Sequence, residues 1–249
     1  MKVSVSLPDD DVAFLDEPKS SVAAAMKGFD AAGIREVVVV PLFVSAESTM
    51  TNDYLQYLIG MRSEQRVLNR LQSEGYEIYF PRARATITPA LSGSEVLKRN
   101  VLRRVEALRG SDNGEKLGVL LVGYGDKVYG QQMEEIMQGI GRYLKIQTPM
   151  DAIAYAFCGN LVEYSGEPVA KALHELLETK EQVIVVPVLL AVDEKLQENA
   201  IRAAINAIDT PKRVRYAGDA ILPDAAVGAW AIERVDEALQ RVRDAGGRT

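Results

Sequence analysis

A tyrosine between two glycines, followed by a carboxylate, is the first candidate for chemistry in this sequence. The tetrad reads Gly-Tyr-Gly-Asp at residues 123–126. The phenol of Tyr124 can donate a hydrogen bond or, once a metal has deprotonated it, act as a ligand. The carboxylate of Asp126 can bind a divalent ion. We therefore take Tyr124 and Asp126 as candidate catalytic residues, with the backbone of Gly123 and Gly125 beside a ligand.

Two more polar segments follow apolar runs, at residues 41–53 and 187–199. In the first, hydroxyls and one carboxylate are candidates either for binding a ligand or for capping the next helix. For the carboxylate, stabilising the start of that helix is the favoured role. These side chains are Ser45, Ser48, Thr49 and Asp53.

The second polar segment carries two acids and a lysine in succession. Asp193 and Glu194 are candidates for holding a metal ion or for capping the following helix, and capping is favoured. The ammonium group of Lys195 cannot ligate a metal while it is charged, but it suits an anionic ligand. Lys195 is therefore the third candidate catalytic residue.

The glycines of the tetrad do not complete a nucleotide-binding motif. A dinucleotide fingerprint needs a third glycine at position 128, where the chain has Val128. A phosphate-binding loop needs Gly-Lys-Ser/Thr, whereas Gly130 is followed by two glutamines. We therefore expect no nucleotide cofactor, and we expect the tetrad glycines to allow a tight turn from strand to helix.

The elements that position these segments form an internal repeat. Residues 36–43, Glu-Val-Val-Val-Val-Pro-Leu-Phe, match residues 182–189, Gln-Val-Ile-Val-Val-Pro-Val-Leu. Both are apolar runs rich in β-branched residues, the pattern of strands covered on both faces. Each run lies between helical stretches, and each copy continues with a short strand, a proline-marked turn and a final helix. Five matches in one order indicate a duplication.

Alternating strands and helices predict parallel sheets with right-handed crossovers. The predicted fold is α/β, with two tandem lobes, each a parallel sheet flanked by helices. The lobes span 1–112 and 113–249, joined by the polar linker 110–114. The first copy lacks a counterpart of the strand and helix within 117–144. The other predicted strands are 3–7, 76–80, 153–157 and 213–216, and the other helices are 22–26, 53–73, 169–173, 195–208 and two that end at 104–108 and 234–239.

Composition restricts the class of partner and the compartment. A net charge of −6 argues against a nucleic-acid partner, because phosphate binding needs clustered lysine and arginine. The single cysteine, Cys158, fits a reducing cytoplasm and is expected to be a buried thiol. Residues 1–11 carry one lysine and three consecutive acids, so we expect no secretory signal there, and the sequence contains no apolar run of about 18 residues that would cross a membrane. The cytoplasm is therefore the expected compartment, with no membrane partner.

The segments after the strands resemble the sirohydrochlorin chelatase (CbiX-like) family of class II metallochelatases. In that family one strand ends in Gly-His-Gly-Ser, and another reads Val-Pro-Leu-Phe before a histidine and an aspartate. Here the tetrad stands at 123–126 and Val-Pro-Leu-Phe at 40–43. The positions of the family's second histidine and aspartate hold Thr49 and Asp53 in one copy, and Lys195 and Asn199 in the other.

This resemblance implies insertion of a divalent metal, cobalt or iron, into a tetrapyrrole such as sirohydrochlorin, in cobalamin or siroheme biosynthesis and without ATP. Such an enzyme must accept two pyrrole protons and deliver the metal, and neutral imidazole suits both tasks. The one histidine, His174, is expected to be an ordinary helix residue away from the strand ends. The resemblance also implies that Lys195 pairs with a macrocycle carboxylate and that the site lies between the lobes.

Three hypotheses stay open. The protein is a chelatase, or a non-catalytic homologue that binds a tetrapyrrole or a metal and has lost the chelatase histidines, or an unrelated α/β enzyme that uses Asp126 and Lys195. The missing strand would leave a sheet edge bare, so we expect another copy of the chain or residues 8–19 to cover it, which makes a homo-oligomer possible. Trp230, in the final helix, is expected to lie in the core.

Overall fold

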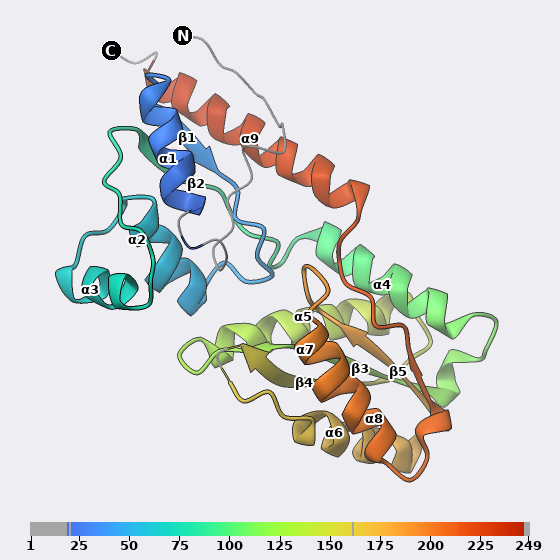
Figure 1. The fold of residues 1–249 in the computed structure, drawn as a ribbon. Coiled ribbons are helices and arrows are strands. Elements are labelled where there is room, and N and C mark those ends of the chain that lie inside the picture. The colour runs from blue at the N-terminus through green and yellow to red at the C-terminus, as the bar shows by residue number, and fades with distance from the viewer. Residues whose placement is uncertain (1–18, 20, 161, 247–249) are drawn as a thin grey trace. The chain divides into compact units, whose positions relative to one another are not determined.

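The computed structural model describes residues 19, 21–160 and 162–246, and the chain forms two compact units (Figure 1). Unit 1 is assigned Met1–Pro41, Glu47–Pro89 and Arg234–Thr249, and unit 2 Leu42–Ala46 and Ala90–Glu233. The predicted strand 3–7 lies outside the described residues. The boundaries of these units differ from those of the sequence repeat. The lobe limits 1–112 and 113–249 therefore stay a prediction.

Unit 2 contains a parallel four-stranded sheet in the order β4-β3-β5-β6. In its middle, Val119 lies opposite Ile153 on one side and Ile184 on the other. Every residue of β3 except Tyr124 is buried, as its continuous apolar run predicts. The predicted α/β fold with parallel strands is confirmed. The strands are β3 (Leu117–Gly125), β4 (Ala152–Asn160), β5 (Gln182–Pro187) and β6 (Val214–Tyr216).

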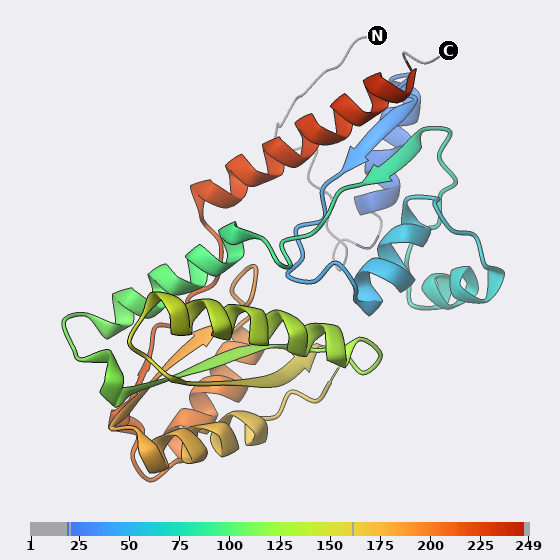
Figure 2. The same cartoon turned by 180° about the vertical axis from the view of Figure 1, so that it is seen from behind.

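Helices cover both faces of this sheet (Figure 2). On one face α4 packs against α5, and on the other α6 packs against α8. The helix predicted at 195–208 is present as one run from 194 to 207 that includes a π-helical stretch, η4. The ranges are α4 (Glu95–Arg109), α5 (Gly130–Gln147), α6 (Glu167–Thr179), α7 (Glu194–Leu196), η4 (Gln197–Arg202) and α8 (Ala203–Ala207).

The core of unit 2 lies between the sheet and these helices. Cys158 is fully buried there, as predicted, and burial raises the pKa of its thiol to about 11. Trp230, near the start of α9 (Ala225–Gly246), is also buried, which confirms its predicted core position. No helix in the described part of the chain has the length and apolarity to cross a membrane.

Unit 1 contains a parallel pair of strands in its described residues. They are β1 (Glu36–Val39) and β2 (Arg84–Ile87), and they are accompanied by helices from both halves of the chain. The helices are α1 (Ser21–Ala31), η2 (Met50–Leu55), α2 (Gln56–Leu58), α3 (Gln65–Ser73) and the end of α9.

Two predictions for unit 1 were wrong. Residues 76–80 form no strand, and β1 pairs instead with the later segment Arg84–Ile87. The helix predicted at 53–73 is interrupted between Leu58 and Gln65, because Gly60 adopts a left-handed φ of 76°. A Cβ atom at Gly60 would also lie 2.7 Å from the ring of Pro81, so this position requires glycine.

Candidate functional site

The carboxyl edge of the unit 2 sheet gathers the polar segments of that unit. All four strands are parallel, so the chain leaves each of them at the same edge. Ligands of open parallel sheets bind at this edge. Tyr124 lies at the end of β3, and the segment containing Asp193 and Lys195 follows β5.

Tyr124 and Asp193 form a close pair at this edge. The phenolic hydroxyl donates a hydrogen bond to Asp193 Oδ2 at 2.6 Å. The other carboxylate oxygen, Oδ1, accepts from Leu196 N at 3.1 Å and so caps α7. Capping, the favoured role for this residue, is confirmed, while Glu194 lies exposed in the first turn of the helix.

The ring of Tyr124 packs against the hydrophobic cluster of unit 2. Tyr124 therefore has apolar partners although a glycine stands on each side of it. The side chain is half-buried, and its hydroxyl, not its ring face, carries the polar contact at the edge.

Gln197, in η4, connects Asp193 to the loop after β6. Its side-chain oxygen accepts from Asp193 N at 2.8 Å, and its side-chain nitrogen donates to Asp219 O at 2.8 Å. The residue is only 1% exposed. Because the amide oxygen accepts one hydrogen bond and the amide nitrogen donates the other, the side chain has one favourable orientation.

Arg104, in α4, anchors the same loop. Its guanidinium holds the Asp219 carboxylate through Nε at 3.0 Å and Nη2 at 2.6 Å. Nη1 donates to Pro187 O, the last carbonyl of β5, at 2.7 Å. The residue is 6% exposed, so this fork of charge-assisted hydrogen bonds is largely shielded from water.

Three residues of this cluster were not predicted from the sequence: Arg104, Gln197 and Asp219. A signal for Arg104 was present, because it lies on the buried face of α4, where three of the five buried residues are apolar. The buried residues of that helix are Leu97, Asn100, Val101, Arg104 and Val105. A polar residue at such a position needs buried partners, but their identity depends on segments far away in the sequence.

The remaining residues of the tetrad have structural roles in unit 2. Asp126 is buried, and its Oδ1 accepts from Val128 N at 2.9 Å and Tyr129 N at 3.0 Å, which fixes the turn into α5. A Cβ atom at Gly123 would clash with the terminal methyl group of Met137. One at Gly125 would lie 2.7 Å from a methyl group of Val162.

Neither tetrad glycine has a positive φ. The expected reason for these glycines, backbone freedom in a tight turn, was therefore wrong. Both glycines instead lie in β3, where a side chain at Gly125 would press on Val162 and one at Gly123 would require the flexible end of Met137 to move.

Lys195 lies exposed near the same edge. Its Nζ is 4.1 Å from the centre of the Tyr164 ring, a cation–π contact. It stands two residues after Asp193, at the start of α7. The ammonium group is thus held by an aromatic face and accessible to an anion from solvent.

The candidates in segment 41–53 divide between the units. Ser45 is buried and belongs to unit 2. Ser48 belongs to unit 1, and its Oγ accepts from Thr51 N at 3.1 Å, a capping contact. Thr49 directly precedes η2, and Asp53 lies in the first turn of η2, where it pairs with Arg70 at 3.5 Å. Ser48 thus makes a capping contact, one of the two roles left open for it, and Asp53 stands at the start of a helix as predicted.

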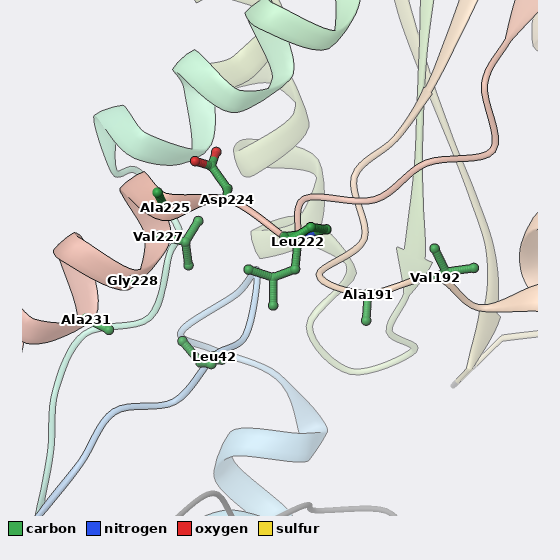
Figure 3. Close-up of a pocket in the computed structure, with 10 residues that line it drawn as sticks. Leu42, Ala191, Val192, Leu222, Asp224, Ala225, Val227, Gly228 and Ala231 are labelled. Atoms are coloured by element: carbon green, nitrogen blue, oxygen red, sulfur yellow. The ribbon is translucent and has the colours of Figure 1, made fainter. Parts of the chain in front are cut away.

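An apolar pocket of about 610 Å³ lies within unit 2 (Figure 3). Its walls come from Leu42, from the loops after β5 and β6, and from the first turns of α9, including Val227 and Gly228. Asp224 lines it too, but its carboxylate points toward α4. There it accepts from Asn100 Nδ2 at 2.8 Å and Arg103 Nη2 at 3.0 Å. The pocket is an open, shallow depression that presents apolar surface to solvent.

Residues 19, 21–160 and 162–246 contain no group of three or more His, Cys, Asp or Glu side chains placed to hold a metal ion. His174 lies exposed in the middle of α6, as predicted for an ordinary helix residue. Asp193 and Glu194 are accordingly not joined by a third such ligand within these residues.

Solved structures share the fold of this chain. SirB from Bacillus subtilis with Fe³⁺ matches with a TM-score of 0.58 and 19% identity, over 90% of this chain and 79% of that one. The sirohydrochlorin chelatase SirB from Bacillus subtilis subspecies spizizenii, in complex with cobalt, matches with a TM-score of 0.56 and 16% identity, over 94% and 77%. No family model and no curated protein sequence matches the chain. The chain therefore has a chelatase-like α/β fold.

Proposed function

We propose that this protein binds a tetrapyrrole at the carboxyl edge of the unit 2 sheet and inserts cobalt or iron into it. Sirohydrochlorin is the first macrocycle to test, which would place the protein in cobalamin or siroheme biosynthesis. The fold shared with SirB supports the class, since the SirB structures contain Fe³⁺ and cobalt. The observation that carries the proposal is the 2.6 Å hydrogen bond between Tyr124 and Asp193.

This pair offers a route for one of the two protons that leave the pyrrole nitrogens. The Tyr124 oxygen accepts the proton from nitrogen while its own proton passes to the Asp193 carboxylate. The nitrogen then bonds to the metal, and no free phenolate forms. A phenol backed by a carboxylate would thus take over a task that imidazole performs in the chelatases that this sequence resembles.

Two other features of unit 2 suit the macrocycle. The apolar pocket offers a surface for an uncharged part of the ring. Lys195, exposed on the Tyr164 ring, can pair with a carboxylate side chain of the macrocycle. Ser45, buried in the same unit, stays a candidate for ligand binding, as do Ser48, Thr49 and Asp53 of unit 1.

A spectroscopic titration tests the proposal. Sirohydrochlorin is added to the protein with and without cobalt(II) or iron(II), and its absorbance is followed. Spectral change on binding, with metal insertion faster than in buffer, is the expected result. The absence of any spectral change would overturn the proposal.

The second candidate is a protein that binds the tetrapyrrole without inserting metal. The observation that favours it is that both Asp193 oxygens are already engaged, one by Tyr124 and one by Leu196 N. The variant Tyr124→His with Lys195→His restores imidazoles at both positions. If the wild type inserts metal slowly and the histidine variant inserts it faster, the protein has the chelatase fold but lacks the proton-accepting side chains. If the parent is fast and the variant slower, Tyr124 is itself the working group.

The cytoplasm and a homo-oligomer stay expectations from the sequence. Light scattering of the full chain measures the oligomeric state, and a monomer would contradict the expected assembly.

A further inference from the structure

A continuous series of hydrogen bonds connects α4 to the hydroxyl of Tyr124. It runs from Arg104 to Asp219, then to Gln197, to Asp193 and finally to Tyr124. Its members come from α4, the loop after β6, η4, the loop after β5 and the end of β3. The series thus joins three strand ends of the carboxyl edge to a helix on one face of the sheet.

Burial gives this series its rigidity. Gln197 is 1% exposed and Arg104 is 6% exposed, so water competes little for their hydrogen bonds. Gln197 holds Asp193 N, while the Asp193 carboxylate is fixed by the cap on α7. The backbone and the side chain of Asp193 are therefore fixed separately, and the carboxylate presents Oδ2 to Tyr124 in one orientation.

Arg104 fixes the other end of the series. Two of its guanidinium nitrogens donate hydrogen bonds to the Asp219 carboxylate, and the guanidinium also donates to Asp219 O and Pro187 O. The Asp219 carbonyl that receives Gln197 is therefore itself held against the end of β5. A change at Arg104 would loosen a loop on which the Gln197 amide depends.

We infer that Gln197 and Arg104 are positioning residues for Tyr124. They hold Asp219 and Asp193 so that the phenol keeps a single orientation at the carboxyl edge. The inference rests on the proposed function only where it concerns metal insertion. The position of the phenol is measurable without any ligand.

The ligand-free test uses the full chain labelled with 3-fluorotyrosine and ¹⁹F NMR. Tyr124→Phe identifies the Tyr124 resonance. Gln197→Met removes both halves of the amide at similar side-chain length and is expected to shift or broaden that resonance. Gln131→Met is the matched control, because Gln131 is an exposed glutamine of α5 that contacts Glu135. An unchanged Tyr124 resonance in folded Gln197→Met overturns the inference.

Gln197→Glu serves if Gln197→Met does not fold. Its carboxylate can still accept from Asp193 N, but it cannot donate to Asp219 O. The Tyr124 resonance should then move in this variant as well, since the connection to Arg104 is lost. A resonance unchanged in this variant would count against the inference.

The kinetic test uses metal insertion into sirohydrochlorin. Gln197→Met is expected to lower kcat about tenfold, the scale of one well-placed hydrogen bond, with little change in KM. In the Tyr124→Phe background the same substitution should change kcat less than about twofold, because residues that act as a unit are not additive. An equal loss in both backgrounds overturns the inference. If the wild type binds no tetrapyrrole, the proposed function fails, and the NMR result still decides the positioning role.

Discussion

Asp30 in unit 1 and Arg104 in unit 2 are buried charged side chains at opposite edges of their own sheets. In unit 1 the Asp30 side chain, at the end of α1, is 2% exposed. It accepts from Tyr79 Oη at 2.7 Å, Arg82 N at 2.8 Å and Ala83 N at 2.9 Å, just before β2 begins. In unit 2 the buried Arg104 contacts the end of β5 and the loop after β6.

This difference in location indicates different roles: the contacts of Asp30 stabilise the fold, and those of Arg104 also position a side chain at the site. Asp30 lies at the amino ends of the strands of its sheet. Its partners there are mostly backbone groups of the connection that leads into β2. Arg104 serves the carboxyl edge, where parallel sheets bind ligands, and its partners lead on to Tyr124. Substitutions at Asp30 should therefore affect folding alone, and those at Arg104 both folding and the site.

The largest expected effect is that of Arg104→Met. Removing a buried guanidinium from its partners costs about 3–5 kcal/mol of unfolding free energy, and we expect the lower end of that range because the Asp219 side chain is 42% exposed and can be hydrated. Urea unfolding of the full chain measures the loss. Arg84→Met, which removes an exposed pair with Glu36 in unit 1, is the control and should change little. Equal effects would contradict the contrast between the units.

The next effect is on ligand binding at the apolar pocket. A Cβ atom at Gly228 would meet no atom within 4 Å, so Gly228→Leu can fill the pocket without a clash at the backbone. We expect affinity for sirohydrochlorin to fall about tenfold or more, measured by absorbance titration. Gly28→Leu, at an exposed helical glycine of unit 1 that is equally open, is the matched control. Unchanged affinity in Gly228→Leu would remove the pocket from the site.

Acid should weaken unit 1 through Asp30. Hydrogen bonds from Arg82 N and Tyr79 Oη lower the pKa of Asp30 below its ordinary value of 3.8. The ionised carboxylate therefore stabilises the fold above about pH 4 and loses this contribution as the pH falls through the lowered pKa. Hydrogen exchange of the segment around β2, followed as the pH is lowered from about 5, measures this loss. Asp30→Asn should flatten the pH dependence of hydrogen exchange in this segment. A pH dependence equal to that of the wild type would refute the assignment of the acid effect to Asp30.

The strands and most helices of unit 2 were predictable from the sequence, because continuous apolar runs and helical stripes are local signals. The break at Gly60 was not, because it depends on Pro81, which approaches only in the folded chain. At the site, the cap by Asp193 follows from its place before a helix. Its second partner, Tyr124, is 69 residues away, and Arg104 is 115 residues from Asp219. Side-chain contacts at such separations depend on the tertiary fold, which a local pattern does not encode.

The smallest expected effect is that of Lys195→Gln, and it tests whether the charge at the carboxyl edge of unit 2 serves a ligand. Lys195 is exposed on the Tyr164 ring, and such a contact contributes only about 0.5–1 kcal/mol to stability. Against a carboxylated tetrapyrrole we expect a loss of about two- to fivefold in affinity at low salt, because one solvent-exposed ion pair contributes no more than about 1 kcal/mol. At about 1 M salt screening should abolish the difference.

Lys171→Gln, at an exposed lysine of α6, makes the same change in net charge and should leave affinity unchanged at every salt concentration. If both substitutions weaken binding equally, the net charge of the unit attracts the ligand and Lys195 makes no specific contact. If only Lys195→Gln does so, and only at low salt, the ammonium beside Asp193 contacts the macrocycle, and Tyr124 and Lys195 serve the same site.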